Sequence, residues 1–219
     1  MRVKYLHPWN LGRAEAVNEQ LLLAGKVIVG DEFTALRTVC GVDVSYKRER
    51  YAAAACVVMS YPGLEQVEMV CKRSTVRVEY SPGLLAFREI PPLIPALESL
   101  QSSPDLFICD GHGVAHPRRF GLACHLGLLL DRPVVGCAKS LFVGHFKEPA
   151  EQRGAYEYLY HRGDLVGAVL RTQDNRKPVF ISIGHKVTLE SSLAVILRCT
   201  AKSRIPEPLR QAHIAAGKE

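Results

Sequence analysis

The sequence lacks a secretory signal peptide, and it has no run of about 18 apolar residues that could cross a membrane. It also lacks an internal repeat, a low-complexity tract or a shift in composition that would mark a second domain. Its seven cysteines include no Cys-x-x-Cys pair, and their odd number does not suggest a disulfide framework. These absences predict a single domain over residues 1–219, located in the cytoplasm with reduced thiols.

A zinc site is also disfavoured. Cys109 and His112, together with Cys124 and His125, bring cysteine and histidine close in sequence, but their spacing fits no usual pattern of zinc ligands. Because most of the cysteines lie in apolar segments, we expect buried thiols that pack as small hydrophobic groups.

The composition is that of a soluble globular protein, with 47% hydrophobic and 23% charged residues. A length of 219 residues is ample for one α/β domain with a sizeable core. The net charge of +6 and the pI near 9.0 weakly favour a polyanionic partner such as nucleic acid.

The stretch from Pro104 to Lys139 has the pattern of a strand, a loop, a helix and a second strand. Residues 106–109 are apolar on both faces, which is typical of a central strand in a parallel or mixed sheet. Asp110 and a glycine-rich loop follow, then a helix over 120–130 and a strand over 133–138 that ends at Lys139. Ligands of open α/β sheets lie at the carboxyl ends of the strands. We therefore expect Asp110 and Lys139 at the functional edge.

Further strands are predicted on both sides of this stretch. Apolar runs at 39–46, 51–60 and 64–78, joined by turn-like connections, indicate an antiparallel meander. Three more strands are expected at 155–160, 165–171 and 179–184.

Helices are predicted where apolar residues recur every three or four positions. A helix over 10–29 would cover the sheet with Ala14, Val17, Leu21 and Ala24. Ser81 and Pro82 predict the start of a helix that ends at Glu89, because prolines 91 and 92 interrupt the pattern. The remaining helices are expected at 92–100, 189–199 and 208–216.

Three acids, Asp43, Glu89 and Asp110, each lie in an otherwise apolar element. A carboxylate that points into a core is costly unless it is paired or binds a metal ion. If the strands of Asp43 and Asp110 are neighbours, their carboxylates can converge, with Glu89 approaching from a helix. Such oxygen ligands suit Mg²⁺, and the cluster would suit phosphodiester hydrolysis. The alternative is that each acid makes an isolated salt bridge or caps backbone groups.

The three acids lie in extended sequence blocks: GVDVSY (41–46), YSPGLLAFREIP (80–91) and DGHGVAHPRRFGLACHLG (110–127). Further blocks follow in order: GCAKS (136–140), VGAVLRT (166–172), PVFISIGH (178–185) and PEPLRQAH (206–213). Together these blocks, which extend over nearly the whole chain, resemble the endonuclease V family of deoxyinosine-directed repair nucleases. The block that begins DGHG is the most specific of them.

The resemblance implies a ribonuclease H-like α/β fold, with a mixed β-sheet, an antiparallel meander, parallel strands and helices on both faces. It implies an enzyme that binds Mg²⁺, with Mn²⁺ as a substitute, and that hydrolyses the second phosphodiester bond 3′ to a deoxyinosine. The products would carry 3′-hydroxyl and 5′-phosphate ends. The partner would be deoxyinosine-containing DNA, and the protein would act as a monomer.

The resemblance also assigns catalytic roles by motif. Asp43 and Asp110 would bridge the metal, and Glu89 would be the third carboxylate. His213 would lie near the attacking water or the metal, and Lys139 would contact the scissile region or orient the nucleophile. Without the resemblance, His213 would be interpreted as a surface helix histidine and Lys139 as a solvated lysine at a strand end.

A pocket for an extruded base is implied as well. Tyr80 would be the wedge that fills the space left by the base, and a weakly paired base costs least to extrude. Glycine lets backbone approach a ligand closely, and phosphate contacts position a strand without reading its sequence. The residues expected to bind the substrate in these ways are Gly83, Gly111 and Gly113 (close approach), Leu85 and His116 (pocket walls), and Arg118 and Arg119 (phosphate contacts).

One residue departs from the family pattern. The wedge commonly reads Pro-Tyr-Ile-Pro, whereas this chain has Glu79-Tyr80-Ser81-Pro82. Glu79 in place of proline loosens the backbone and puts a negative charge near phosphate.

Two alternative functions remain open at this point. An inosine-specific endoribonuclease is one, because nothing in the sequence separates tolerance of a 2′-hydroxyl from preference for it. A nucleic-acid-binding module without hydrolytic activity is the other, although all three acids are present.

Overall fold

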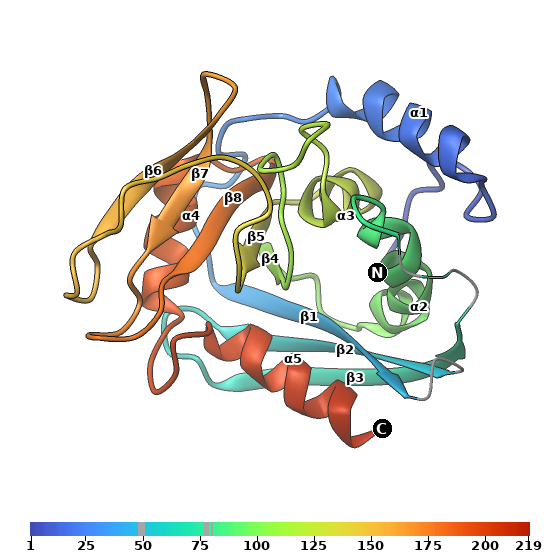
Figure 1. Ribbon diagram of the computed structural model, residues 1–219. Coiled ribbons are helices and arrows are strands. Elements are labelled where there is room, and N and C mark those ends of the chain that lie inside the picture. The colour runs from blue at the N-terminus through green and yellow to red at the C-terminus, as the bar shows by residue number, and fades with distance from the viewer. Residues whose placement is uncertain (48–50, 77–78, 80) are drawn as a thin grey trace.

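One mixed sheet organises the chain (Figure 1). The structure is a computed structural model of residues 1–219 and describes all of them except 48–50, 77–78 and 80. The strands lie in the order β3-β2-β1-β4-β5-β8-β7-β6. Their bounds are β1 Thr38–Lys47, β2 Tyr51–Ser60, β3 Gln66–Thr75, β4 Leu106–Cys109, β5 Val134–Ala138, β6 Tyr156–His161, β7 Asp164–Leu170 and β8 Val179–His185.

The predicted strands are all present, and the antiparallel meander and the mixed sheet are confirmed. β1, β2 and β3 pair antiparallel, while β4 pairs parallel to β1 and β5 parallel to β4. β8 and β7 add to the sheet antiparallel, and β6 closes it at the far edge. The third strand is shorter than predicted, since β3 runs from Gln66 to Thr75 and residues 77 and 78 lie outside the described part.

Helices cover both faces of the sheet, as expected for a ribonuclease H-like fold. Their bounds are α1 Arg13–Ala24, α2 Leu85–Ser99, α3 Leu122–Leu130, α4 Leu189–Arg198 and α5 Glu207–Lys218. α2 and α3 pack on one face through Ile90 and Leu126. α4 and α5 pack on the other through Ile196 and Leu209. Apolar burial on both faces explains why the central strands are apolar throughout.

The two helices predicted around residues 81–100 are a single helix, α2, which begins at Leu85 and includes Pro91, Pro92 and Pro95. The prediction was wrong because proline in a helix interior removes a backbone donor and usually breaks the helix. Here the apolar face of α2, which includes the fully buried Ile90, packs into the core and offsets that loss. Ser81 is not the N-cap; its carbonyl accepts a hydrogen bond from Leu84 N in the preceding turn.

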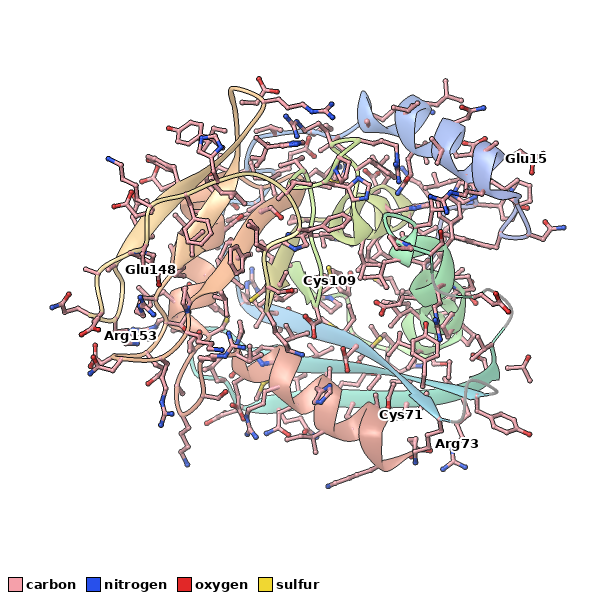
Figure 2. The ribbon with its side chains drawn as sticks, viewed as in Figure 1. Glu15, Cys71, Arg73, Cys109, Glu148 and Arg153 are labelled. Carbon is pink, nitrogen blue, oxygen red and sulfur yellow. The ribbon has the colours of Figure 1, made fainter. Side chains whose placement is uncertain are left out.

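α1 differs from the prediction in length, face and location. Its buried residues are Ala16, Gln20 and Leu23, whereas Leu21 is 56% exposed. Figure 1 shows α1 beyond α2 and α3 and away from the sheet, and its buried residues pack against those two helices and the segments before them. Figure 2 shows Glu15 on its outer side. A buried glutamine cannot be inferred from apolar periodicity, so the helix was assigned the wrong face.

All seven cysteines are free thiols, and six of them are buried. Cys109 ends β4 in the middle of the molecule (Figure 2). Burial raises the pKa of its thiol well above the ordinary value, with further rises from Glu89 and Asp110. None of the helices in the described part of the chain is long and apolar enough to span a membrane.

Candidate active site

The sheet brings Asp43 and Asp110 side by side. The parallel pairing of β1 with β4 ends at Val42 and Cys109, which lie opposite each other, and each acid is the next residue of its chain segment. Beyond this point β1 continues while β4 gives way to the glycine-rich loop. Two carboxylates therefore emerge where two central strands separate.

Glu89 approaches the same point from α2. Tyr46 of β1 fixes the first turns of that helix, because its hydroxyl donates to the Arg88 carbonyl over 3.1 Å. The Arg88 guanidinium also lies over the Tyr46 ring, 4.2 Å from its centroid. Tyr46 and Arg88 have no role in the sequence-based assignment, although their positions beside Asp43 and Glu89 could have suggested one.

The three acids interact electrostatically. Burial raises the pKa of Glu89 to about 8, and repulsion from Asp43 and from Asp110 adds to the rise. Burial also raises the pKa of Asp43; the hydrogen bond from His213 opposes this rise, and the charge of Asp110 adds to it. The chain thus holds negative charges together at a cost, which is typical of a functional site.

Two positively polarised groups contact the aspartates. Lys139, one residue beyond β5, donates a short hydrogen bond to Asp110 Oδ2. His213 of α5 donates from Nδ1 to Asp43 Oδ2 over 2.9 Å, and its side chain is 64% exposed. The two side chains that the sequence assigned to auxiliary roles are therefore at the acids.

A glycine allows α5 to reach Asp43. A Cβ atom built on Gly41 would lie 2.1 Å from the carbonyl carbon of Pro208. Only a residue without a side chain lets the start of α5 lie directly against β1 at this position. His213 follows on the same helix and meets Asp43, two residues beyond Gly41.

A pocket of about 340 Å³ opens beside the acids. Asp110 and Lys139 form one side, while Leu85 of α2 and Gly83 form another. The volume lies in the range of small-ligand sites. Of the residues that the sequence predicted for substrate binding, four line this pocket: Gly83, Leu85, Gly111 and His116.

His116 is held in one protonation state. Its Nδ1 accepts from Arg118 N over 3.2 Å, so Nε2 carries the proton and donates to the Gly83 carbonyl over 3.1 Å. Burial lowers the pKa of His116 to about 4, and the charge of Arg118 lowers it further. At neutral pH the ring is an uncharged part of the pocket wall, and both nitrogens are engaged.

Comparison with known proteins places the chain in a family. The model of the Endonuclease V family matches residues 22–214, which is most of the sequence. The chain belongs to the endonuclease V family. The endonuclease V of Dictyoglomus turgidum is 47% identical over 203 residues, which cover 93% of this chain and 89% of that protein.

Solved structures of endonuclease V have the same fold. The crystal structure from Streptomyces avermitilis has a TM-score of 0.91 at 42% identity and covers 100% of this chain and 97% of that one. Ciona intestinalis endonuclease V has a TM-score of 0.83 at 30% identity, with 94% of this chain and 96% of that one covered. That structure is a complex with a 24mer DNA containing an inosine followed by a ribo-adenosine.

Three residues expected to contact substrate also contact other parts of the protein, and their substrate contacts stay a prediction. Gly113 lies against β8, where a Cβ atom would be 1.8 Å from the Ile183 carbonyl oxygen, and it is not part of the pocket lining. Arg118 donates to Gln20 Oε1 and to the Gly83 carbonyl, both over 2.7 Å. Arg119 bonds His161 and Asp164 of the β6–β7 hairpin. Glycine and arginine fit these packing roles as well as the predicted ones, so the sequence could not separate them.

The wedge lies at the edge of what the structure describes. Tyr80, the predicted wedge, lies outside the described residues, and Glu79 before it is exposed.

The pocket also contains residues that the sequence did not single out. His112, within the DGHG block, donates from Nε2 to the Ser140 carbonyl over 3.0 Å, and its ring stacks on Phe142. His112 and Phe142 both line the pocket. The position of His112 two residues after Asp110 was the available signal, whereas Phe142 gave none.

Carboxylates are the ligands that a hard divalent ion prefers, so the side chains of this site suit such an ion chemically. Their spacing does not suit it as they lie. Within the described residues, no three His, Cys, Asp or Glu side chains stand close enough to hold a metal ion as they lie. The three acids interact electrostatically, but the expectation that they surround one ion stays a prediction. One oxygen of Asp43 accepts a hydrogen bond from His213, and one oxygen of Asp110 accepts a hydrogen bond from Lys139. A hard cation would relieve the repulsion that raises the pKa of Glu89 and Asp43.

Proposed function

We propose that this protein is a Mg²⁺-dependent endonuclease that recognises deoxyinosine in DNA and hydrolyses the second phosphodiester bond 3′ to it, leaving 3′-hydroxyl and 5′-phosphate ends. The observation that supports this most is the convergence of Asp43, Glu89 and Asp110 beside a pocket. The inosine-containing DNA bound by the Ciona relative supports the choice of substrate.

Asp43, Glu89 and Asp110 would hold Mg²⁺, or Mn²⁺ in its place. The ion would supply activation of water and neutralisation of charge on the attacked phosphate. The carboxylates would be ligands of the ion, and they keep the site polar where two strands separate. Because the pKa values of Asp43 and Glu89 are raised by burial and by repulsion from neighbouring acids, binding of a cation would favour their ionised form.

Lys139 would supply positive charge at this site, and His213 would transfer a proton. The Lys139 ammonium beside Asp110 is 40% exposed, so it can attract the phosphate backbone as the strand approaches. His213 holds Asp43 through Nδ1 and is exposed enough to exchange protons with water. It can therefore take up or release a proton beside the reacting phosphate.

The pocket beside the acids would receive the extruded base. Leu85 and Leu122 supply apolar walls, and Gly111 brings backbone to the surface of the pocket. Neutral His116 adds a polar but uncharged wall. Extrusion of a base costs a few kcal/mol and costs least for a weakly paired base, so the lesion itself contributes to selection.

A nicking assay tests the proposal. A duplex with one deoxyinosine should be cut once, at the second bond 3′ to the lesion, with Mg²⁺ and not with EDTA. Asp43→Ala and Asp110→Ala should each lower the rate by about a thousandfold or more, since the metal contributes several kcal/mol to such reactions. Glu151→Gln, an exposed acid far along the chain, is the matched control.

Binding of the inosine duplex without any strand cleavage in Mg²⁺ would instead support the non-hydrolytic module. Full activity of both aspartate variants would refute the assigned active site.

An inosine-directed endoribonuclease is the second candidate. The ribo-adenosine that follows the inosine in the DNA of the Ciona complexes favours it, because a 2′-hydroxyl is accepted next to the lesion there. Cleavage rates on matched DNA and RNA strands, identical except for the sugar, decide between the two.

A further inference from the structure

Gln20 is a buried amide in α1, a helix whose outer face is exposed. Its side chain is 1% exposed and points inward from α1, while Leu21 and Leu22 beside it are largely exposed. Burial of an amide is costly unless its hydrogen bonds are satisfied. The position also lies just outside residues 22–214, the segment matched by the family model.

Both polar atoms of this amide are hydrogen-bonded, to Gly83 of the pocket lining and to two residues of the loop before α3. Nε2 donates to the Gly83 carbonyl over 3.0 Å and to the Phe120 carbonyl over 3.1 Å. Oε1 accepts from Arg118 Nε over 2.7 Å. One side chain thereby connects the turn before α2 with the loop before α3, the two segments that flank the pocket.

The Gly83 carbonyl is the centre of this network. It accepts hydrogen bonds from Gln20 Nε2, Arg118 Nη2 and His116 Nε2, over 2.7 to 3.1 Å. Three donors on one carbonyl fix the orientation of the peptide, which glycine alone would leave mobile.

The backbone of Gly83 also requires a glycine. Its φ of +79° belongs to the left-handed region. A Cβ atom there would lie 2.7 Å from Arg118 Nη2, so the network leaves no room for a side chain. Gly83 and Gln20 both line the pocket.

We propose that Gln20 is a positioning residue for base recognition: together with Arg118 it clamps the Gly83 turn and His116 in the shape that accepts the extruded base. The inference rests on the proposed function and deepens it. It assigns Arg118 to the support of the pocket wall and not to a phosphate. It also assigns α1 to the support of that wall, through Gln20. Gln20 acts through Gly83 and His116 and does not itself need to touch the reacting phosphate.

The test is a comparison of binding to two single strands that differ in one base, deoxyinosine or deoxyadenosine, in EDTA. Gln20→Leu preserves the approximate volume and removes all three hydrogen bonds. We expect affinity for the inosine strand to fall about tenfold or more, since a buried carbonyl and a guanidinium lose partners. Affinity for the adenosine strand should stay the same, so discrimination falls.

Asn18→Leu is the matched control, because it replaces an exposed amide in the same helix. It should leave both affinities unchanged. In Mg²⁺, Gln20→Leu should raise KM for the inosine strand more than it lowers kcat, because the metal-binding acids are untouched. Because binding is compared in EDTA, its result does not depend on whether hydrolysis occurs.

Arg118→Lys gives a second measurement, and it also serves if Gln20→Leu does not fold. Lysine keeps the charge but lacks the planar fork with which Arg118 bonds Gln20 through Nε and Gly83 through Nη2. It should lose discrimination like Gln20→Leu, and the double variant should be little worse than either single one, as expected for one network. The proposal would be overturned if Gln20→Leu still preferred the inosine strand over the adenosine strand as strongly as wild type does. If Gln20→Leu does not fold, the same result for Arg118→Lys would overturn it. Equal loss of both affinities would overturn it too.

Discussion

Glu89 is the residue whose ionisation is most altered by the fold, and this alteration has a measurable effect on stability. Its pKa rises from 4.5 to about 8. Between these values the unfolded chain ionises while the folded chain keeps the proton, so the stability present below about pH 4.5 is lost as the pH rises through 8. In EDTA, Glu89→Gln should therefore unfold at a higher temperature than wild type at pH 9 and at a similar temperature at pH 4.5.

Mg²⁺ provides the control for that experiment. The ion should raise the unfolding temperature of wild type at pH 9 because it binds the folded acids, and it should have less effect on Glu89→Gln. Thermal unfolding followed by circular dichroism measures both. If the unfolding temperature of wild type had the same pH dependence as that of Glu89→Gln, the fold would not raise the pKa of Glu89.

At the scale of residues, the sequence predicts which side chains carry the chemistry better than it predicts which side chains contact one another. Asp43, Glu89 and Asp110 stood out because carboxylates are rare in apolar elements. The contacts of Asp110 with Lys139 and of Asp43 with His213 join residues 29 and 170 positions apart, and no local pattern encodes them. Arg118 and Arg119 were expected at phosphates because arginine suits both phosphate and carbonyl acceptors. Their protein partners became evident only from the packing.

At the scale of elements, the contact between β1 and α5 places His213. Gly41→Ala should push α5 away from β1, because the new methyl group would overlap the Pro208 carbonyl. We expect a loss of about 1–3 kcal/mol in the free energy of unfolding, as for overpacked cores. Activity should fall at least as far as in His213→Ala.

Gly217→Ala is the matched control, because Gly217 lies in α5 and has open space around it. It should leave stability and activity near those of wild type. Stability and activity of Gly41→Ala equal to those of Gly217→Ala would contradict the assigned role of the close contact.

Elements that depend on apolar runs and turn residues are predictable from the sequence, and features that depend on tertiary packing are not. The meander and the parallel strands followed from apolar runs and turn residues. The continuity of α2 through Pro91, Pro92 and Pro95 depends on burial of its apolar residues, which the local preference of proline does not reveal. The orientation of α1 depends on Gln20, whose inward position is set by the Gly83 turn and Arg118.

At the scale of the whole molecule, the sheet order explains why distant segments meet. β1, β4 and β5 are neighbours, so Asp43, Asp110 and Lys139 lie at the same edge, and α2 and α5 bring Glu89 and His213 from opposite faces. The pocket opens at this edge, and α1 supports it from outside the sheet. The likeness to endonuclease V extends over the whole of this arrangement.

Binding of Mn²⁺, followed by loss of the free-ion signal in electron paramagnetic resonance, tests most directly whether the three acids form one metal site. Wild type should bind the ion, whereas Asp43→Asn, Asp110→Asn and Glu89→Gln should each weaken binding about tenfold or more, as expected when a ligand is removed. Glu151→Gln should bind like wild type. Wild-type affinity in the Asp43 and Asp110 variants would contradict the account.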